Sequence, residues 1–181
     1  MKAIILILRI VANVAISSIS FRAHSCLAAP KVEIVIAGKI LTASFISPLP
    51  IVGSSNLKPT RTFAGTEYFE FAVKNSHGIV YGNVVAVRQK KPKMPPDKLL
   101  QELLDSLRVT FSEPRGRKWK TTKYKDQEVS IFSITGVDGD FGAASVRSGD
   151  TWITFSLQQD NSYKDNSLGW ILEAIIRSLR I

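Results

Sequence analysis

Alternation of apolar and charged residues between Glu67 and Gln89 gives the clearest strand signal in this chain. In EYFEFAVK, Phe69, Phe71 and Val73 share one side, and Glu70, Ala72 and Lys74 fall on the other. NSHG then offers turn chemistry, and IVYGNVVAVRQ resumes an extended pattern. The alternation predicts a half-buried β-hairpin, which the prolines of KKPKMPP bring to an end.

Three further segments, EVSIFSIT, FGAASVR and TWITFSLQ, also predict strands. Asp138-Gly139 and Ser148-Gly149 lie between them, and such residue pairs favour tight hairpin turns. Ahead of the first hairpin, residues 32–46 are rich in Val, Ile, Ala and Thr and predict one or two strands. Residues 47–60 contain three prolines and predict a loop or an N-terminal extension.

Two segments carry apolar residues at helical spacing. Leucines form one stripe in DKLLQELLDSLR, residues 97–108, and a second stripe runs from Leu168 to Arg180. Each helix needs a sheet against which to bury its stripe, and strands joined by tight turns make that sheet mainly antiparallel. The predicted fold class is therefore α+β, a mainly antiparallel sheet with helices packed on it.

This order of elements resembles that of the PsbP-like domains, a family named after an extrinsic subunit of photosystem II. The matching features are GNVVAVRQ running into PDKLLQELLDSLR, the meander of EVSIFSIT and TWITFSLQ, and the helix ending IIRSLR, within residues 69–181. Relatives often end in a Ser-Phe-Arg-like sequence, from which Ser178-Leu179-Arg180 departs. The resemblance implies an α/β/α sandwich and a non-enzymatic binding or assembly role, and it supplies no site residues.

The N-terminus has the pattern of a secretory signal peptide. Lys2 precedes a mostly apolar run, and small residues gather at Ser25–Ala29 ahead of Pro30. The uncharged, mostly apolar piece Ile10–Ile19 is too short for a bilayer span of ~20 residues. Cleavage is predicted after residue 28, and an uncleaved anchor and a lipoprotein acylated at Cys26 remain as alternatives.

Cleavage would remove three cations and no acids, which lowers the formal net charge from +9 to +6. It would also remove Cys26, so the mature chain would have neither a disulfide nor a thiol nucleophile. The predicted organisation is a signal peptide (1–28), N-terminal strands with a proline-containing loop (29–60) and an α+β binding domain (61–181). We expect the protein to be periplasmic or secreted.

Motifs for catalysis or metal binding are scarce. His77 would be the one histidine of the mature chain, and it lies in a turn, so a Ser-His-acid triad or a zinc site lacks the residues it needs. Asp138 and Asp140 resemble only the start of a calcium loop. No cofactor is predicted. The alternative function is a hydrolase with a carboxylate pair, because the separation of acids in space cannot be read from a sequence.

The stretch RGRKWKTTKYK, Arg115 to Lys125, holds six cations and two aromatic residues in eleven positions, with no acid. One interpretation is an exposed loop or edge strand, where lysines discourage pairing with other sheets. A second is a site for an anionic envelope component or an acidic protein, which Arg88 and the lysines after it could extend. Nucleic acid is the third, since aromatic residues stack on bases, but predicted export argues against it.

We therefore expect an exported, non-enzymatic accessory domain that engages a protein or an anionic envelope partner, and possible association with a membrane surface. Trp152 shares a strand face with Thr154, Ser156 and Gln158, and would line a shallow ligand groove unless a helix covers that face. The candidate binding residues are Arg115, Arg117, Lys118, Trp119, Lys120, Lys123, Tyr124, Lys125 and Trp152.

Overall fold

A computed structural model of the protein describes residues 31–88, 116–135, 139–160 and 168–181, and of residues 116–119 it describes the backbone alone. Strands take 68% of the described residues, and these contain one helix, α3 (Gly169–Ser178). The predicted α+β class, with its α/β/α sandwich, is therefore wrong for this part of the chain. Alternating apolar residues dominate it, and the predicted helix at 97–108 lies outside the described residues.

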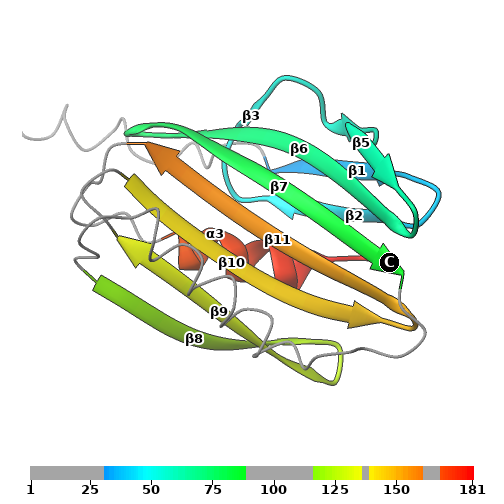
Figure 1. Cartoon of the computed structure of the whole chain (residues 1–181). Helices are drawn as coiled ribbons and strands as arrows, with labels where there is room; N and C mark the ends of the chain where they lie inside the picture. Colours follow the sequence, from blue (N-terminus) through cyan, green and yellow to red (C-terminus); the bar gives the residue numbers. More distant parts are fainter. Residues whose placement is uncertain (1–30, 89–115, 136–138, 161–167) are drawn as a thin grey trace, which may run out of the picture.

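The larger of two sheets has eight strands, and every pairing within it is antiparallel. Its order is β3-β6-β7-β11-β10-β9-β8, and β5 lies beside β6 (Figure 1). The strands are β3 (Ile51–Val52), β5 (Arg61–Phe63), β6 (Thr66–Asn75), β7 (Gly78–Arg88), β8 (Gly116–Tyr124), β9 (Gln127–Thr135), β10 (Gly139–Ser148) and β11 (Thr151–Asp160).

The strongest sequence signals lie in this sheet where they were expected. The predicted hairpin is confirmed: β6 pairs with β7 along its whole length, down to Asn75 opposite Gly78. A tight turn between β10 and β11 is also confirmed, but it consists of Gly149 and Asp150, one position after the predicted Ser148-Gly149, with Ser148 opposite Thr151. Gly149 has a φ of 58° there, a backbone conformation that glycine adopts without steric cost.

The smaller sheet comprises β1 (Val32–Ala37), β2 (Thr42–Ser47) and β4 (Asn56–Leu57), in the order β2-β1-β4. Strands β1 and β2 are antiparallel, whereas β4 runs parallel to β1. The prediction of strands within residues 32–46 is confirmed. The loop predicted for residues 47–60 is interrupted by the two short strands β3 and β4, which join one to each sheet.

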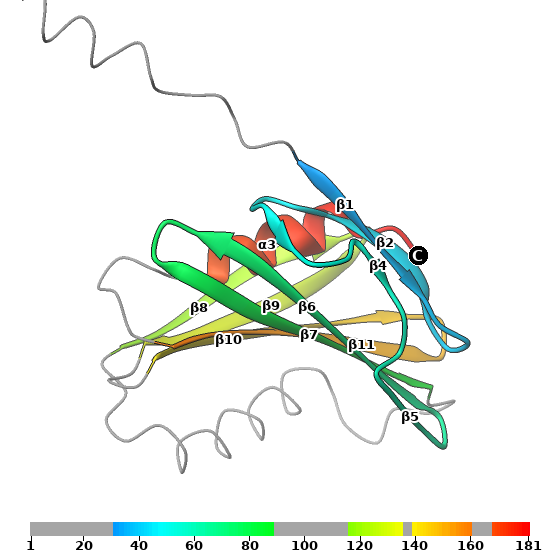
Figure 2. The same ribbon diagram turned by 90° about the horizontal axis from the view of Figure 1, so that it is seen from above.

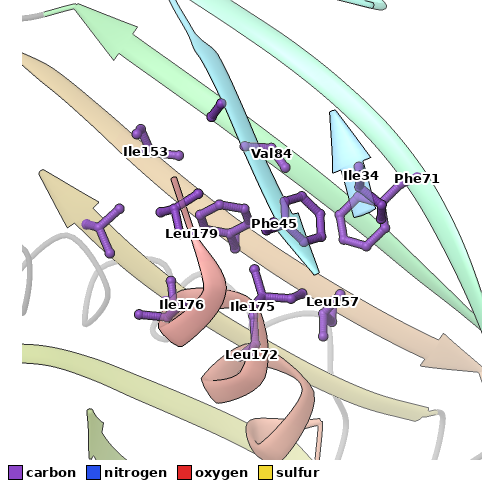
Figure 3. Close-up of a cluster of buried hydrophobic side chains, with 14 of the residues drawn as sticks. Ile34, Phe45, Phe71, Val84, Ile153, Leu157, Leu172, Ile175, Ile176 and Leu179 are labelled. Atoms are coloured by element: carbon purple, nitrogen blue, oxygen red, sulfur yellow. The ribbon is translucent and has the colours of Figure 1, made fainter. Parts of the chain in front are cut away.

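The two sheets and the helix share one hydrophobic core. Figure 2 shows α3 and the smaller sheet on the same face of the larger sheet. Phe45 of β2 makes an edge-on ring contact with Phe71, at 5.5 Å between ring centroids (Figure 3). A second edge-on contact joins Phe45 to Phe155, at 5.7 Å. The predicted C-terminal stripe is buried against the same core, through Leu168, Ile171, Leu172, Ile175, Ile176 and Leu179. Residues 31–57 are therefore integral to the fold.

Candidate functional site

Strand register brings several turns to one end of the larger sheet, here called the turn end. The β8–β9 turn follows Tyr124, the β10–β11 turn follows Ser148, and β7 stops at Arg88, which lies opposite Thr151. The β5–β6 turn belongs to the same end, because Thr66 lies opposite Val87. Figure 1 shows these turns along one side of the molecule, together with the β1–β2 loop.

Hydrogen bonds connect neighbouring turns along this end. The Gln127 side chain donates to the backbone oxygen of Arg147 at 2.9 Å, and the Arg147 guanidinium donates to the oxygen of Gly149 at 3.0 Å. Farther along, the backbone N–H of Arg88 donates to the oxygen of Gly65 at 2.8 Å. The turns therefore form one continuous surface.

The turn end is rich in positive charge. Exposed carboxylates there are Asp126, Glu128 and Asp150. The opposite end, where β6 and β11 stop and β8 and β10 begin, carries Asp140 and Asp160 beside Lys74, and the strand register brings Arg117 and Lys118 of β8 to it as well. Seven cations of the described residues lie at or near the turn end: Lys39, Lys58, Arg61, Arg88, Lys123, Lys125 and Arg147. Cations therefore outnumber the exposed carboxylates at the turn end.

The predicted basic stretch is divided by the structure. Within the described ranges β8 pairs with β9 alone, so the edge-strand interpretation of its backbone is confirmed. Arg115, and the side chains of Arg117, Lys118 and Trp119, lie outside the described residues. Lys123 and Lys125 are exposed at the turn end, and Arg88 lies at that same end.

Lys120, also a predicted binding residue, is tied to the helix instead. Its ammonium group forms an ion pair with Glu173 of α3, and Arg177 pairs with the same carboxylate at 2.6 Å. The guanidinium of Arg177 also donates to the Thr122 hydroxyl at 3.3 Å. This network joins β8 to α3 and uses the charge of Lys120 within the protein.

Tyr124 faces inward, although it was predicted as a binding residue. Its side chain is 3% exposed and belongs to the hydrophobic core. The phenol oxygen has no hydrogen-bond partner among the described residues. Lys125 lies over the ring, 5.3 Å from its centroid. The ring cannot stack on a ligand without leaving the core.

Trp152 lies on the face of β11 that points away from α3, together with Thr154 and Ser156. It is 8% exposed, and the guanidinium of Arg147 lies 5.8 Å from its ring centroid. Phe132 and Phe141 are buried on the same face, with ring centroids 5.9 Å apart. The buried ring does not line an open groove, and this agrees with the interpretation of Trp152 as a core residue.

A pocket of about 490 Å³ lies between the β1–β2 loop, the segment before β5 and the start of β6, and the sequence analysis did not identify it. Lys39 and Lys58 have no ion-pair partner among the described residues. The residues that line the pocket are Ala37, Gly38, Lys39, Thr42, Lys58, Pro59, Thr62 and Glu67.

Glu67 forms the floor of this pocket and is 1% exposed. Its carboxylate accepts hydrogen bonds from three consecutive backbone N–H groups of the β1–β2 loop: Lys39 at 2.8 Å, Ile40 at 3.0 Å and Leu41 at 3.3 Å. A buried carboxylate requires such partners. The sequence indicated that Glu67 is buried, because Glu67 lies on the same side of the predicted strand as the apolar residues Phe69 and Phe71.

The pocket does not contain the pair of carboxylates on which the predicted alternative function depends. A hydrolase of the predicted alternative type needs two cooperating carboxylates, and this pocket contains one, which is already fully hydrogen-bonded. No cluster of three or more potential metal ligands occurs in the described ranges. Those same ranges contain no helix with the length and apolar character to cross a bilayer.

Neither a protein-family model nor a curated protein matches this chain.

Proposed function

We propose that this protein is an exported binding domain that attaches to an anionic envelope component through the turn end. The observation that carries the proposal is the gathering of cations from five separate segments onto one end of the sheet. Strand pairing brings cations that are distant in the sequence, such as Arg88 and Lys125, to this one end.

The size of the electrostatic attraction can be bounded. Each basic residue close to an anionic membrane surface contributes on the order of 1 kcal/mol, and screening limits its range to ~8 Å at physiological salt. Three exposed carboxylates and the buried Glu67 oppose seven cations, which leaves about three effective charges and about 3 kcal/mol. That free energy corresponds to a dissociation constant of about 6 mM. Charge alone therefore supports weak, reversible attachment.

The test is binding to an immobilised soluble polyanion, polyphosphate, at increasing salt. We expect the affinity to fall steeply with salt, because cations on the protein displace condensed counterions. The triple variant Arg88→Gln, Lys123→Gln, Lys125→Gln should lose most of the binding. The matched control is Lys74→Gln, an exposed lysine near the opposite end, which should bind like the native protein.

Binding that is unaffected by salt, or an equal loss in both variants, would contradict attachment through the turn end. Export is tested separately. The intact mass of the protein purified from its own cells should equal that of a chain beginning at Ala29, or show a lipid on Cys26 in the acylated case. A full-length product in the cytosol would contradict export.

A further inference from the structure

The β5–β6 hairpin carries an exposed apolar side chain at the turn end. Phe63 is 64% exposed, the largest exposed fraction among the large hydrophobic side chains of the described residues. Ala64 and Gly65 form the turn that follows it, and Gly65 has a φ of 76°. Figure 2 shows this hairpin at the extremity of the sheet. Water surrounds most of an apolar ring at this position.

The two sides of strand β5 have different chemistry. Phe63 shares its side with Arg61, and its ring meets Tyr68 at right angles, 6.1 Å between centroids. Thr62 points to the other side, where it lies opposite Glu67 and lines the pocket with Lys39 and Lys58. An aromatic ring and a basic pocket are therefore separated by the width of one strand.

The charge of the pocket suits a singly charged anion. Two lysines and one carboxylate leave a net charge of +1. Glu67 is held by the β1–β2 loop through three N–H groups, so its oxygens are not available to pair with the lysines. The hydroxyl group of Thr62 adds a hydrogen-bond donor at the wall, whereas the hydroxyl group of Thr42 donates to the oxygen of Gly38 at 3.4 Å. A phosphodiester carries one negative charge and several acceptor oxygens.

We propose that the anionic partner is a phospholipid bilayer, with a headgroup phosphodiester in the pocket and Phe63 inserted at the boundary between headgroups and acyl chains. This inference rests on the proposed function and names its partner. A bilayer places an apolar layer directly beneath its anionic surface. The two lysines can therefore contact headgroups while Phe63 contacts the apolar layer. A polysaccharide or an acidic peptide offers the charge without that layer. Apolar insertion also supplies free energy beyond the weak electrostatic term.

Binding to sedimented vesicles tests the lipid assignment. Vesicles of phosphatidylglycerol and phosphatidylcholine should bind the native protein, and vesicles of phosphatidylcholine alone should bind it much more weakly. Phe63→Ser should weaken binding to the anionic vesicles about tenfold, the effect of returning an aromatic ring to water. The control is Tyr81→Ser, which removes another aromatic ring, 51% exposed on β7 away from the turn end. It should bind like the native protein.

A double variant tests the role of the pocket. Lys39→Gln combined with Lys58→Gln should weaken binding to the anionic vesicles more than the control variant Lys74→Gln does. Phe63→Ser should leave binding to polyphosphate unchanged, because that ligand has no apolar layer. If Phe63→Ser binds anionic vesicles as tightly as the native protein, insertion is refuted. Binding to polyphosphate but not to vesicles refutes the lipid assignment and leaves the proposed function intact, and binding to neither refutes both.

Discussion

Gly38 lies directly against the carboxylate of Glu67, with no space for a side chain between them. A Cβ atom at position 38 would overlap Oε2 of Glu67 and would lie 2.7 Å from the ring of Phe69. The same carboxylate holds the backbone of the β1–β2 loop through Lys39, Ile40 and Leu41. The smaller sheet is thus fixed to the larger one by a contact that depends on both residues.

Replacement of Gly38 should be costly for this reason. We expect Gly38→Ala to lower the free energy of unfolding by about 1–3 kcal/mol, as overpacking of a filled site does. Urea denaturation measures the change. In the double variant with Glu67→Ala the loss should be smaller than the sum of the two single losses, because both substitutions act on one contact. Full additivity would show that Gly38 is constrained by something else.

Glu67→Gln tests the hydrogen bonds of the carboxylate. The amide keeps one acceptor oxygen but directs its NH₂ group at backbone N–H donors, which leaves buried donors unpaired. We expect the free energy of unfolding to fall by about 1–3 kcal/mol. The control is Glu70→Gln on the exposed side of the same strand, which should change it by less than about 0.5 kcal/mol. Similar values for the two variants would argue against a structural role for Glu67.

Tyr124→Phe should not destabilise the protein. The phenol oxygen of Tyr124 is buried without a hydrogen-bond partner among the described residues, so its removal relieves a desolvation cost. We expect the free energy of unfolding to stay the same or rise by up to about 1 kcal/mol. Thermal and urea unfolding both measure this. A clear fall in the free energy of unfolding would mean that the hydroxyl group is hydrogen-bonded in solution.

Phe45→Ala tests whether the two sheets unfold together. The ring of Phe45 contacts Phe71 and Phe155, so its loss should lower the free energy of unfolding by about 3–5 kcal/mol. Circular dichroism and tryptophan fluorescence should report one common transition at a lower urea concentration. Phe63→Ala, at an exposed position, should change the urea concentration of the unfolding transition little. Separate transitions for the two probes would indicate that the smaller sheet folds independently.

Much of the strand arrangement could be predicted because alternation in a strand is a local property. Phe69, Phe71 and Val73 repeat at every second position, and the sequence around Gly149 favours a tight turn. The prediction of fold class was wrong because two apolar stripes at helical spacing were taken to form a layer of helices on the sheet. In the described residues the strands outweigh the single helix α3.

The candidate site was harder to predict, because its residues meet only through pairing between distant strands. Lys39, Lys58 and Glu67 are scattered in the sequence, and no local motif connects them. Tyr124 was named a candidate binding residue, with packing on the core as the alternative, because its segment showed no clean apolar side. In the fold the side of β8 that holds Thr122 and Tyr124 is covered, and Lys120 on that side reaches the helix.

The pairing of Ser44 with Arg180 has a consequence for how the chain acquires its structure. Each residue donates its backbone N–H to the oxygen of the other at 2.8 Å, so strand β2 is completed by a segment near the C-terminal end of the sequence. The side chain of Ser178 reinforces the junction by accepting from the N–H of Ile46, 132 residues away in sequence. Formation of this junction closes a loop of more than a hundred residues, so we expect folding to be slow, because contacts between residues this far apart in the sequence lower the folding rate.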